Sequence, residues 1–279
     1  MNLAIAGIRK FRTRTATIVS LIVAVILVVL EFVLVGVSYR SATATTATSS
    51  GVDKATFDWL LTFPGAYEAV LALAFEFLGI IGLIYVVTAS GSEWTWGTLK
   101  VAVARGQSRW QYTVATFASL GFILLIGLLI TFAAGVAAAA VGGSIAGLPI
   151  GNPADPSELA QVLVKLARAW IALMGLTSLG YAVAMVTRSQ MAGIGTVIGY
   201  FIVSIIGPAL LPDFVKEAFK YLPFSIAADS VGLMAPSSSG AITSASAVEP
   251  NLALLVTIGW LVGCLLVASI FVERAEISG

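Results

Sequence analysis

The sequence has no histidine and a single cysteine, Cys264, among its 279 residues. One cysteine cannot form a disulfide within the chain, and without histidine the usual nitrogen and sulfur ligand sets for zinc cannot be assembled. Histidine is also the commonest general base, and no Ser/Lys or paired-Asp site stands in for it. We therefore expect no metal site and no catalytic site, and we interpret the chain as a non-enzymatic protein.

Charged residues are also scarce. They make up 10% of the sequence, whereas hydrophobic residues make up 59%. A soluble globular domain carries roughly 25% charged residues. This composition predicts a polytopic membrane protein that is surrounded by lipid, and we expect no nucleic-acid partner.

Long apolar stretches predict the spans. A transmembrane helix needs about 20 mainly apolar residues, and six stretches meet or approach that length. The third and fourth are longer than a bilayer requires, so we expect them to tilt or to protrude. The expected fold is an all-α polytopic membrane protein, a single transmembrane domain over 1–279 with six transmembrane helices near 17–37, 66–90, 111–141, 159–187, 191–211 and 250–272.

The basic residues predict the orientation. Segment 1–16 carries four of them and no acidic residue, which places this end in the cytoplasm by the positive-inside rule. The first apolar stretch is longer than a signal-peptide core of roughly 7–15 residues, so we interpret it as a retained signal-anchor helix. Six crossings then put both termini in the cytoplasm. The inside segments hold nine basic and three acidic residues, which agrees with this topology: 1–16, 91–110, 188–190 and 273–279.

The segment 212–249 differs from the other outer loops. Its first part places apolar Phe214, Ala218 and Tyr221 on one side of a helix and charged side chains on the other, which predicts a short helix in the outer interface. The following SSSGAITSASA is typical of a flexible linker.

The segment 91–110, GSEWTWGTLKVAVARGQSRW, is the most charged and aromatic stretch between two spans. Its composition predicts a short helix from Trp94 to Val103 on the inner membrane surface, ended by Gly106 in a left-handed turn. One interpretation is an interfacial anchor, because tryptophan and basic residues mark membrane edges. The other is a docking element, because an anchor needs no free carboxylate such as Glu93 beside Gly97-Thr98.

The order Glu93, Gly97-Thr98, Arg105-Gly106-Gln107-Ser108-Arg109 resembles the "E…GT…R…SR" signature of ABC type-2 transporter permeases. In that family the stretch forms a coupling helix that sits in a groove of a separate ATP-binding subunit. The resemblance implies that ATPase coupling in this chain involves Glu93, Trp94, Gly97, Thr98, Arg105 and Arg109.

The resemblance extends along the chain. The amphipathic segment 1–16 is similar to the cytoplasmic elbow helix, VTRSQMAGIG to the tight inside turn, KYLPFS within 212–249 to the outer re-entrant helices, and FVERAE to the family's C-terminal end. One departure is visible. Family members often carry a basic residue a few positions into the third helix, whereas this chain has Ala115 and Thr116 near that place.

Nucleotide chemistry is absent from this chain. A P-loop needs GxxxxGK[ST], whose backbone amides and lysine hold the phosphates, and the sequence contains no Gly-Lys pair. The resemblance implies that ATP and Mg are bound by a partner, an ABC ATP-binding subunit, and that two permeases form a homodimer with two ATPases. We expect no cofactor in this chain.

Two GxxxG steps mark places where helices can approach closely. One is Gly195 and Gly199 in the fifth predicted span, and the other is Gly259 and Gly263 in the sixth. Either is a dimer face or ordinary packing within one subunit. The resemblance points to the first and fifth helices, so Gly195 and Gly199 are the dimer-packing candidates.

Two carboxylates lie within predicted spans, Glu31 in the first and Glu76 in the second. An ionised residue at the bilayer centre costs roughly 2.5–3.5 kcal/mol, so each should face protein or water or be protonated. One hypothesis places them on the translocation path. The other is structural, with each hydrogen-bonded to neighbouring helices or paired with Lys165 or Arg168.

The leading interpretation is the permease subunit of an ATP-driven ABC exporter in a bacterial or archaeal plasma membrane, moving an apolar or amphipathic substrate outward. The alternative is a proton-coupled secondary transporter that uses Glu31 and Glu76, although no convincing repeat relates the two halves of the sequence. An intramembrane enzyme is the third class. The sequence does not name a substrate, and it leaves open pairing with a second, different permease.

Overall fold

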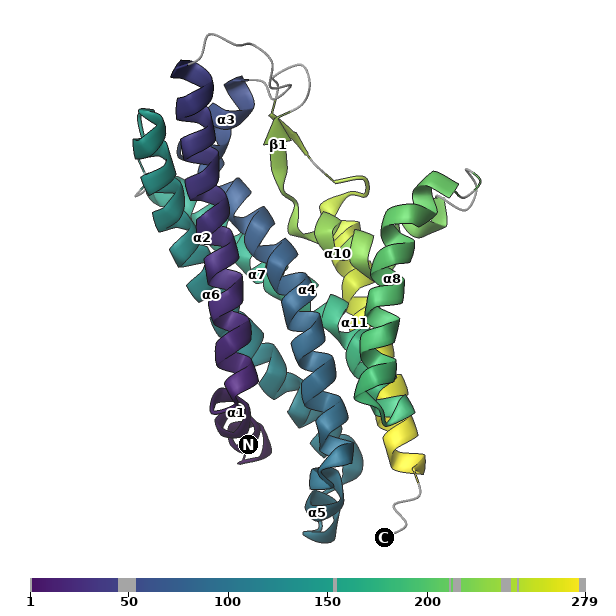
Figure 1. Cartoon of the computed structure of the whole chain (residues 1–279). Helices are drawn as coiled ribbons and strands as arrows, with labels where there is room; N and C mark the ends of the chain where they lie inside the picture. The colour runs from purple at the N-terminus through teal and green to yellow at the C-terminus, as the bar shows by residue number, and fades with distance from the viewer. Residues whose placement is uncertain are drawn as a thin grey trace.

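The computed structural model describes residues 2–44, 54–152, 155–210, 212, 217–236, 242–244 and 246–275. The described chain is a helical bundle with one small β-hairpin near one end (Figure 1). Its elements are α1 (Asn2–Arg12), α2 (Thr15–Ala44), α3 (Lys54–Leu61), α4 (Gly65–Thr95), α5 (Thr98–Ala104), α6 (Arg109–Ala146), α7 (Pro156–Thr187), α8 (Gln190–Leu210), α10 (Pro223–Val231), β1 (Met234–Pro236), β2 (Ile242–Ser244) and α11 (Pro250–Arg274).

Five helices, α2, α4, α6, α7 and α11, are long and apolar enough to cross a membrane. The chain is therefore a multi-pass helical membrane protein, and these five spans of the sequence prediction are confirmed as helices. The fifth predicted span, 191–211, coincides with α8, but its described apolar part, Gln190–Val203, is shorter than the others. A crossing by α8 stays a prediction. The start of α1 and the end of α11 lie toward the same end of the bundle, as an even number of crossings requires (Figure 1).

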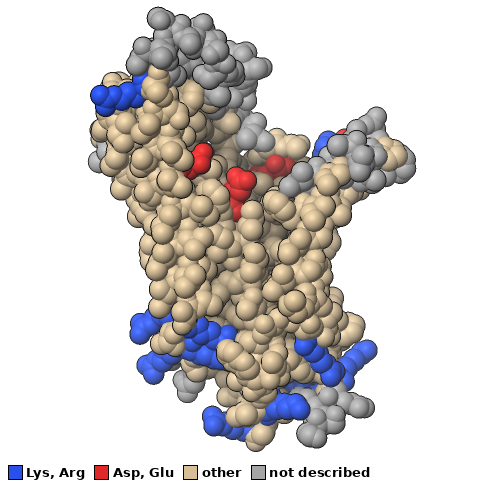
Figure 2. All heavy atoms as spheres, viewed as in Figure 1, with Lys and Arg blue, Asp and Glu red and all other residues tan. Residues whose placement is uncertain are grey.

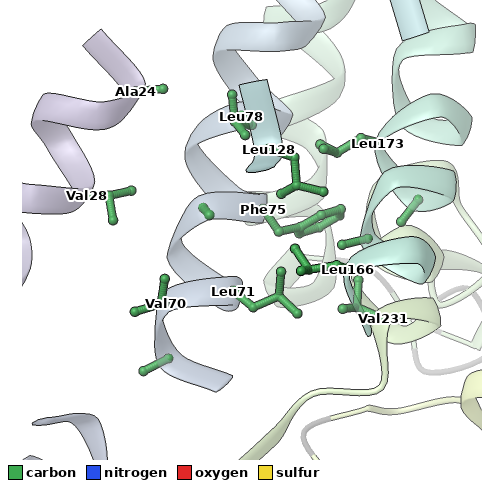
Figure 3. Packing of buried hydrophobic residues seen from close by; sticks show 14 of the residues in the cluster. Ala24, Val28, Val70, Leu71, Phe75, Leu78, Leu128, Leu166, Leu173 and Val231 are labelled. Atoms are coloured by element: carbon green, nitrogen blue, oxygen red, sulfur yellow. The ribbon is translucent and has the colours of Figure 1, made fainter. Parts of the chain in front are cut away.

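The centre of the bundle is formed by α4 and α7. In their most apolar segments 61% and 67% of the residues are buried, compared with 17% for α2 and 22% for α11. Figure 3 shows Leu71 and Phe75 of α4 pointing toward Leu166 and Leu173 of α7. The two outer helices therefore present most of their apolar surface to the surroundings, as expected where lipid replaces water.

Helices α2 and α6 approach each other closely at two glycines. A Cβ atom on Gly36 would lie 2.5 Å from the carbonyl oxygen of Gly142 and 2.7 Å from its Cα. Both neighbours are backbone atoms, which cannot rotate away as a side chain can. Glycine at this position is what allows the two helices to pack in contact.

We expect Gly36→Ala to lower the free energy of unfolding by about 1–3 kcal/mol, because the added methyl group forces α2 and α6 apart. Thermal unfolding in detergent measures this loss. Gly127→Ala in α6 is the matched control, because a Cβ at Gly127 meets only two side-chain atoms, at 3.8 and 3.9 Å. Equal stability of the two variants would contradict the close packing of α2 on α6.

The predicted tight turn after the fourth span is confirmed. Helix α7 ends at Thr187 and α8 begins at Gln190, with Arg188 in the left-handed region at φ 56°. At the other end, α7 starts on Asp155, whose carboxylate accepts hydrogen bonds from the Ser157 backbone N–H and hydroxyl at 3.0 and 2.7 Å. These bonds to the hydroxyl and the backbone hold the pKa of Asp155 below its ordinary value.

The outer segment contains more structure than the sequence indicated. Helix α10 buries Ile226, Ala227 and Val231 in the bundle, so it is packed and not merely interfacial. The expected flexible linker contains β2, which pairs antiparallel with β1, so that expectation is wrong for Ile242–Ser244. Phe214 and Lys216 of the predicted interfacial helix lie outside the described residues.

Asp229 of α10 holds the chain that leads to α11. Its carboxylate accepts the backbone N–H groups of Ala247 and Val248 at 3.2 and 3.1 Å. Burial raises the pKa of Asp229, although these two hydrogen bonds act in the opposite direction. Loss of hydration is thus the larger influence on this carboxylate.

Charge divides the molecule into two ends. Figure 2 shows most of the visible Lys and Arg side chains gathered around the end that carries α1 and α5, and the visible acidic side chains toward the other end. We call the first of these the basic end. This distribution is the one that the positive-inside rule associates with the cytoplasmic surface.

Candidate functional site: the polar junction at the basic end

The junction between α4 and α5 differs from the predicted one. Helix α4 continues past the expected end at 90 to Thr95, and α5 begins at Thr98 instead of Trp94. Gly97 makes the turn between them at φ 65°, a left-handed conformation that other residues rarely adopt. The predicted left-handed end at Gly106 is confirmed at φ 82°. Glu93 therefore belongs to the last turn of a membrane helix and not to a loop.

Glu93 is fully buried, and its carboxylate is held by two cations. The Lys10 ammonium donates to both carboxylate oxygens at 2.6 and 2.7 Å. The Arg14 guanidinium lies 3.4 Å from Oε1 and also donates to the Ser92 hydroxyl at 3.0 Å. The Lys10 and Arg14 side chains are 31% and 16% exposed, compared with 0% for Glu93. A buried carboxylate requires such partners, because burying an unpaired charge is costly.

Two neutral donors complete the shell around Glu93. The Thr98 hydroxyl and the Tyr112 hydroxyl each donate to Oε2 at 2.5 Å. We call Glu93, Lys10, Arg14, Thr98 and Tyr112 the Glu93 cluster. It joins four segments, namely α1 with the turn after it, the end of α4, the start of α5 and the start of α6.

The cluster gives a physical reason for the Glu…Gly-Thr order. Glu93 ends α4, Gly97 reverses the chain, and Thr98 then starts α5 with its hydroxyl pointing back at the Glu93 carboxylate. The same hydroxyl lies 3.2 Å from the Glu93 carbonyl oxygen. The spacing therefore encodes a closed helix-to-helix turn.

The expectation of a free carboxylate at Glu93 is wrong. The side chain has no exposed surface and no vacant position for a protein partner. A molecule that approached the junction would meet Trp96, which is 64% exposed, and the exposed side chains of Lys100 and Arg105. Any role of Glu93 in coupling is therefore to hold α5 in place.

The cations that contact Glu93 come from the N-terminal part of the chain and not from α6. Lys10 and Arg14 lie 83 and 79 positions before Glu93 in the sequence. The sequence alone indicates a topological role for these two basic residues and does not single out Tyr112. The sequence signal that could have indicated such partners was the Glu93 carboxylate itself, because an acidic residue buried at the end of a membrane helix requires a cation.

Tyr112→Phe removes one donor to Glu93 without changing the ring. Hydrogen bonds to charged groups contribute about 1.5–3 kcal/mol, so we expect a loss of free energy of unfolding in that range. Thermal unfolding in detergent is the measurement. Tyr221→Phe at the opposite end is the control, because its ring is 44% exposed. An unchanged Tyr112→Phe protein would mean that this hydroxyl does not hold the carboxylate.

Aromatic rings contact the cations around the Glu93 cluster. The Arg14 guanidinium lies 4.9 Å from the Phe11 ring centroid and 4.8 Å from that of Trp96. The Arg188 guanidinium lies 5.0 Å from the Trp94 ring centroid, and Trp94 is partly buried. Cation–π contacts of this kind orient the charges without neutralising them.

The two arginines predicted for coupling have different surroundings. Arg109 donates to the carbonyl oxygens of Glu273 and Ala275 at 2.9 and 2.6 Å, so it ties the start of α6 to the end of α11. A cation is favourable at a helix C-terminus, where the carbonyl groups are negative. Arg105, in contrast, is exposed just after α5. Arg105 is therefore the better placed of the two for contact with another molecule.

Glu31 and Glu76 lie outside this cluster. Both are exposed on the surface of the chain, and neither has a polar partner among the residues that the structure describes. The proposed ion pairs are wrong, because Lys165 pairs with Glu68 and the Arg168 guanidinium donates to Asn251 at 2.7 Å. A second subunit, lipid or a water-filled path must therefore face these carboxylates in the membrane.

The GxxxG steps also face outward. A Cβ built on Gly195, Gly199, Gly259 or Gly263 meets nothing within 4 Å. Packing within one subunit is therefore not the reason for these glycines among the described residues. Both α8 and α11 therefore present a small-residue stripe on the surface of the described chain.

The sequence of this chain matches the family described as "Protein of unknown function (DUF2705)" over residues 47–278. This range covers most of the chain, including the Glu93 end of α4, α5 and all of the later helices. The chain belongs to that family. No curated protein matches the sequence significantly.

Proposed function

We propose that this member of the DUF2705 family is the membrane subunit of an ATP-driven ABC exporter and that α5 is its coupling helix. In this proposal two copies form a homodimer in a bacterial or archaeal plasma membrane, with both termini in the cytoplasm. A separate ATP-binding subunit binds ATP and Mg, and the permease moves an apolar or amphipathic substrate outward.

The observation that carries the proposal is the position of α5 and its attachment to the neighbouring helices. It projects at the basic end beyond the neighbouring helices (Figure 1). Its inner side is anchored by buried Leu99 and Ala102, whereas Val101 and the preceding Trp96 are 51% and 64% exposed. The Glu93 cluster joins this projecting helix directly to α4 and α6. A push on α5 is therefore transmitted to two membrane helices as rigid-body motion.

An interfacial anchor explains these features less well. Lipid contact needs only exposed aromatic and basic side chains, which many membrane helix ends possess. A buried ion cluster contributes little net stability, because the cost of removing charges from water offsets their attraction. Such a cluster is better explained by a need for one fixed geometry of α5 than by a need for membrane affinity.

The direct test is to tag the chain, solubilise it gently from its native membrane and identify what co-purifies. The proposal expects an ATP-binding subunit in the eluate and ATP hydrolysis that vanadate inhibits. Recovery of the tagged chain without an ATP-binding subunit, under conditions that keep known ABC complexes intact, would overturn the proposal. The same preparation, cross-linked before solubilisation, reports whether one or two kinds of permease are present.

Glu31 and Glu76 favour a second candidate, a proton-coupled transporter. Each is an exposed carboxylate within a helix that is long enough to span the membrane, a position that is rare unless it has a function. Proton transport through them predicts that vesicles containing the purified chain move solute down a proton gradient without ATP. It also predicts that Glu76→Gln and Glu31→Gln abolish this movement, by about the 10²-fold or more expected for loss of a proton carrier.

If both variants transport normally and lose only thermal stability, the hypothesis that these carboxylates carry protons is wrong. The outcome does not depend on the ATPase test, because the proton gradient and ATP are supplied in separate vesicle preparations.

A further inference from the structure

Two cavities flank the first half of α2 at the basic end. One, of about 240 Å³, lies between α2, α4 and α6. The other, of about 680 Å³, lies between α2, α4 and the start of α8, and we call it the inner groove. The two share Ser20, Ile81 and Tyr85 in their linings, so the first half of α2 stands away from α4 on both sides.

The inner groove changes from polar to apolar along its length. Arg14, Ser92 and Trp96 line its end nearest the Glu93 cluster, and Val19 and Ile81 line its apolar part. Along α4, Ile81 and Trp96 are about 22 Å apart at 1.5 Å per residue. This length exceeds half of the about 30 Å thickness of a bilayer's hydrocarbon core. The groove therefore runs from the level of lipid headgroups into one leaflet.

The polar end carries an excess of positive charge. In the Glu93 cluster two cations, Lys10 and Arg14, face a single carboxylate, and Thr98 and Tyr112 contribute no charge. Arg14 is the basic residue among those that line the inner groove itself. The Arg14 guanidinium lies over the exposed Trp96 ring. Its positive charge is only partly neutralised by the 3.4 Å contact with Glu93. An anionic group at this position would be attracted, whereas a zwitterionic group would gain less.

We propose that the inner groove binds an anionic glycerophospholipid from the leaflet at the basic end. Its phosphate lies against Arg14 beside the Trp96 ring, and an acyl chain follows Val19, Ile81 and Ile84. The bound lipid fills the space between α2 and α4 and supplies the negative charge that the Glu93 cluster lacks. This inference does not depend on the proposed transport function.

The test uses the full-length chain in mixed micelles that contain phosphatidylglycerol and phosphatidylcholine of equal chain length. Native mass spectrometry counts the lipids retained by each chain. A basic residue near a membrane surface contributes about the equivalent of a fivefold change in binding to an anionic lipid. We therefore expect the wild type to retain phosphatidylglycerol at least about fivefold better than phosphatidylcholine.

Three variants locate the site. Ile84→Trp fills the apolar part and should abolish retention of phosphatidylglycerol, because Ile84 lines the groove and is 39% exposed. Arg14→Gln removes the headgroup cation, leaves Lys10 on both oxygens of Glu93 and should reduce the preference by about fivefold. Arg274→Gln, an exposed basic residue at the end of α11, is the matched control and should retain the lipid.

Equal retention of both lipids by the wild type would overturn the proposal, as would undiminished phosphatidylglycerol binding by Ile84→Trp. Equal losses in Arg14→Gln and Arg274→Gln would also overturn it, because they would indicate attraction to the whole basic end instead of the groove. Thermal unfolding of each variant checks that it is folded. If Ile84→Trp does not fold, the comparison of Arg14→Gln with Arg274→Gln decides the question.

Discussion

Glu93→Gln is expected to lower the free energy of unfolding by about 3 kcal/mol, the lower part of the range for breaking a buried ion pair. The variant leaves Lys10 and Arg14 beside a neutral amide with no carboxylate to balance them. The loss stays near the lower part of the range because Lys10 is 31% exposed and retains some contact with water. Thermal unfolding in detergent, followed by the loss of helical signal, is the measurement.

The matched control is Glu273→Gln, an exposed carboxylate near the end of α11. Its backbone carbonyl accepts from Arg109, and this contact survives the substitution. We expect Glu273→Gln to unfold like the wild type. An equal stability of Glu93→Gln and Glu273→Gln would show that the Glu93 cluster does not hold the four segments together.

Trp96→Ala combined with Arg105→Glu is expected to reduce retention of the ATP-binding subunit by at least about 30-fold, the equivalent of the 2 kcal/mol that defines an interface hot spot. Tryptophan and arginine are the residue types most often found in such hot spots. Both side chains are exposed around α5, so the double variant should unfold at nearly the wild-type temperature. Co-purification with a tagged chain measures the retained subunit.

Tyr221→Ala is the control for this experiment, because it removes an exposed aromatic ring far along the chain from α5. It should retain the subunit at the wild-type level. Wild-type retention by the Trp96→Ala and Arg105→Glu double variant would mean that α5 is not the docking surface. The interfacial-anchor interpretation would then explain the exposed side chains.

The two experiments separate two roles of one junction. Glu93 is buried, so its replacement acts through the stability and orientation of α5. Trp96 and Arg105 are exposed, so their replacement acts on whatever touches α5. A variant of Glu93 that still binds the ATP-binding subunit but no longer couples hydrolysis to transport is the combination that a coupling helix predicts.

The spans were the most predictable feature of the fold. Whether a segment enters a membrane depends on the summed transfer free energy of neighbouring residues, which is local information. The five confirmed helices follow from that sum. The end of α4 could not be predicted from that sum, because a carboxylate at position 93 indicates the start of a polar loop. Its helical position depends on cations supplied by Lys10 and Arg14, which are remote in sequence.

The glycine pattern, unlike the hydropathy of the spans, did not predict where helices pack closely within the chain. The sequence marked Gly195 and Gly199 as a close-packing motif but left open whether the partner lies inside or outside the subunit. The structure shows open space beside both, and it places a close approach of two helices at Gly36 and Gly142, which form no GxxxG step with each other. Two glycines on different helices leave no spacing signal in a single sequence.

The sequence by itself determined that this protein is a helical membrane protein with its basic residues concentrated at one end, because hydropathy and charge are sums over nearby residues. It also placed Glu93, Gly97 and Thr98 in an order typical of a helix-to-helix turn. Only the tertiary structure decided that Glu93 is buried, that Lys10, Arg14 and Tyr112 enclose it, and that Glu31 and Glu76 are left unpaired among the described residues. The physical reason is that burial and charge pairing depend on which helices pack together, and that choice is made by contacts between segments far apart in the chain.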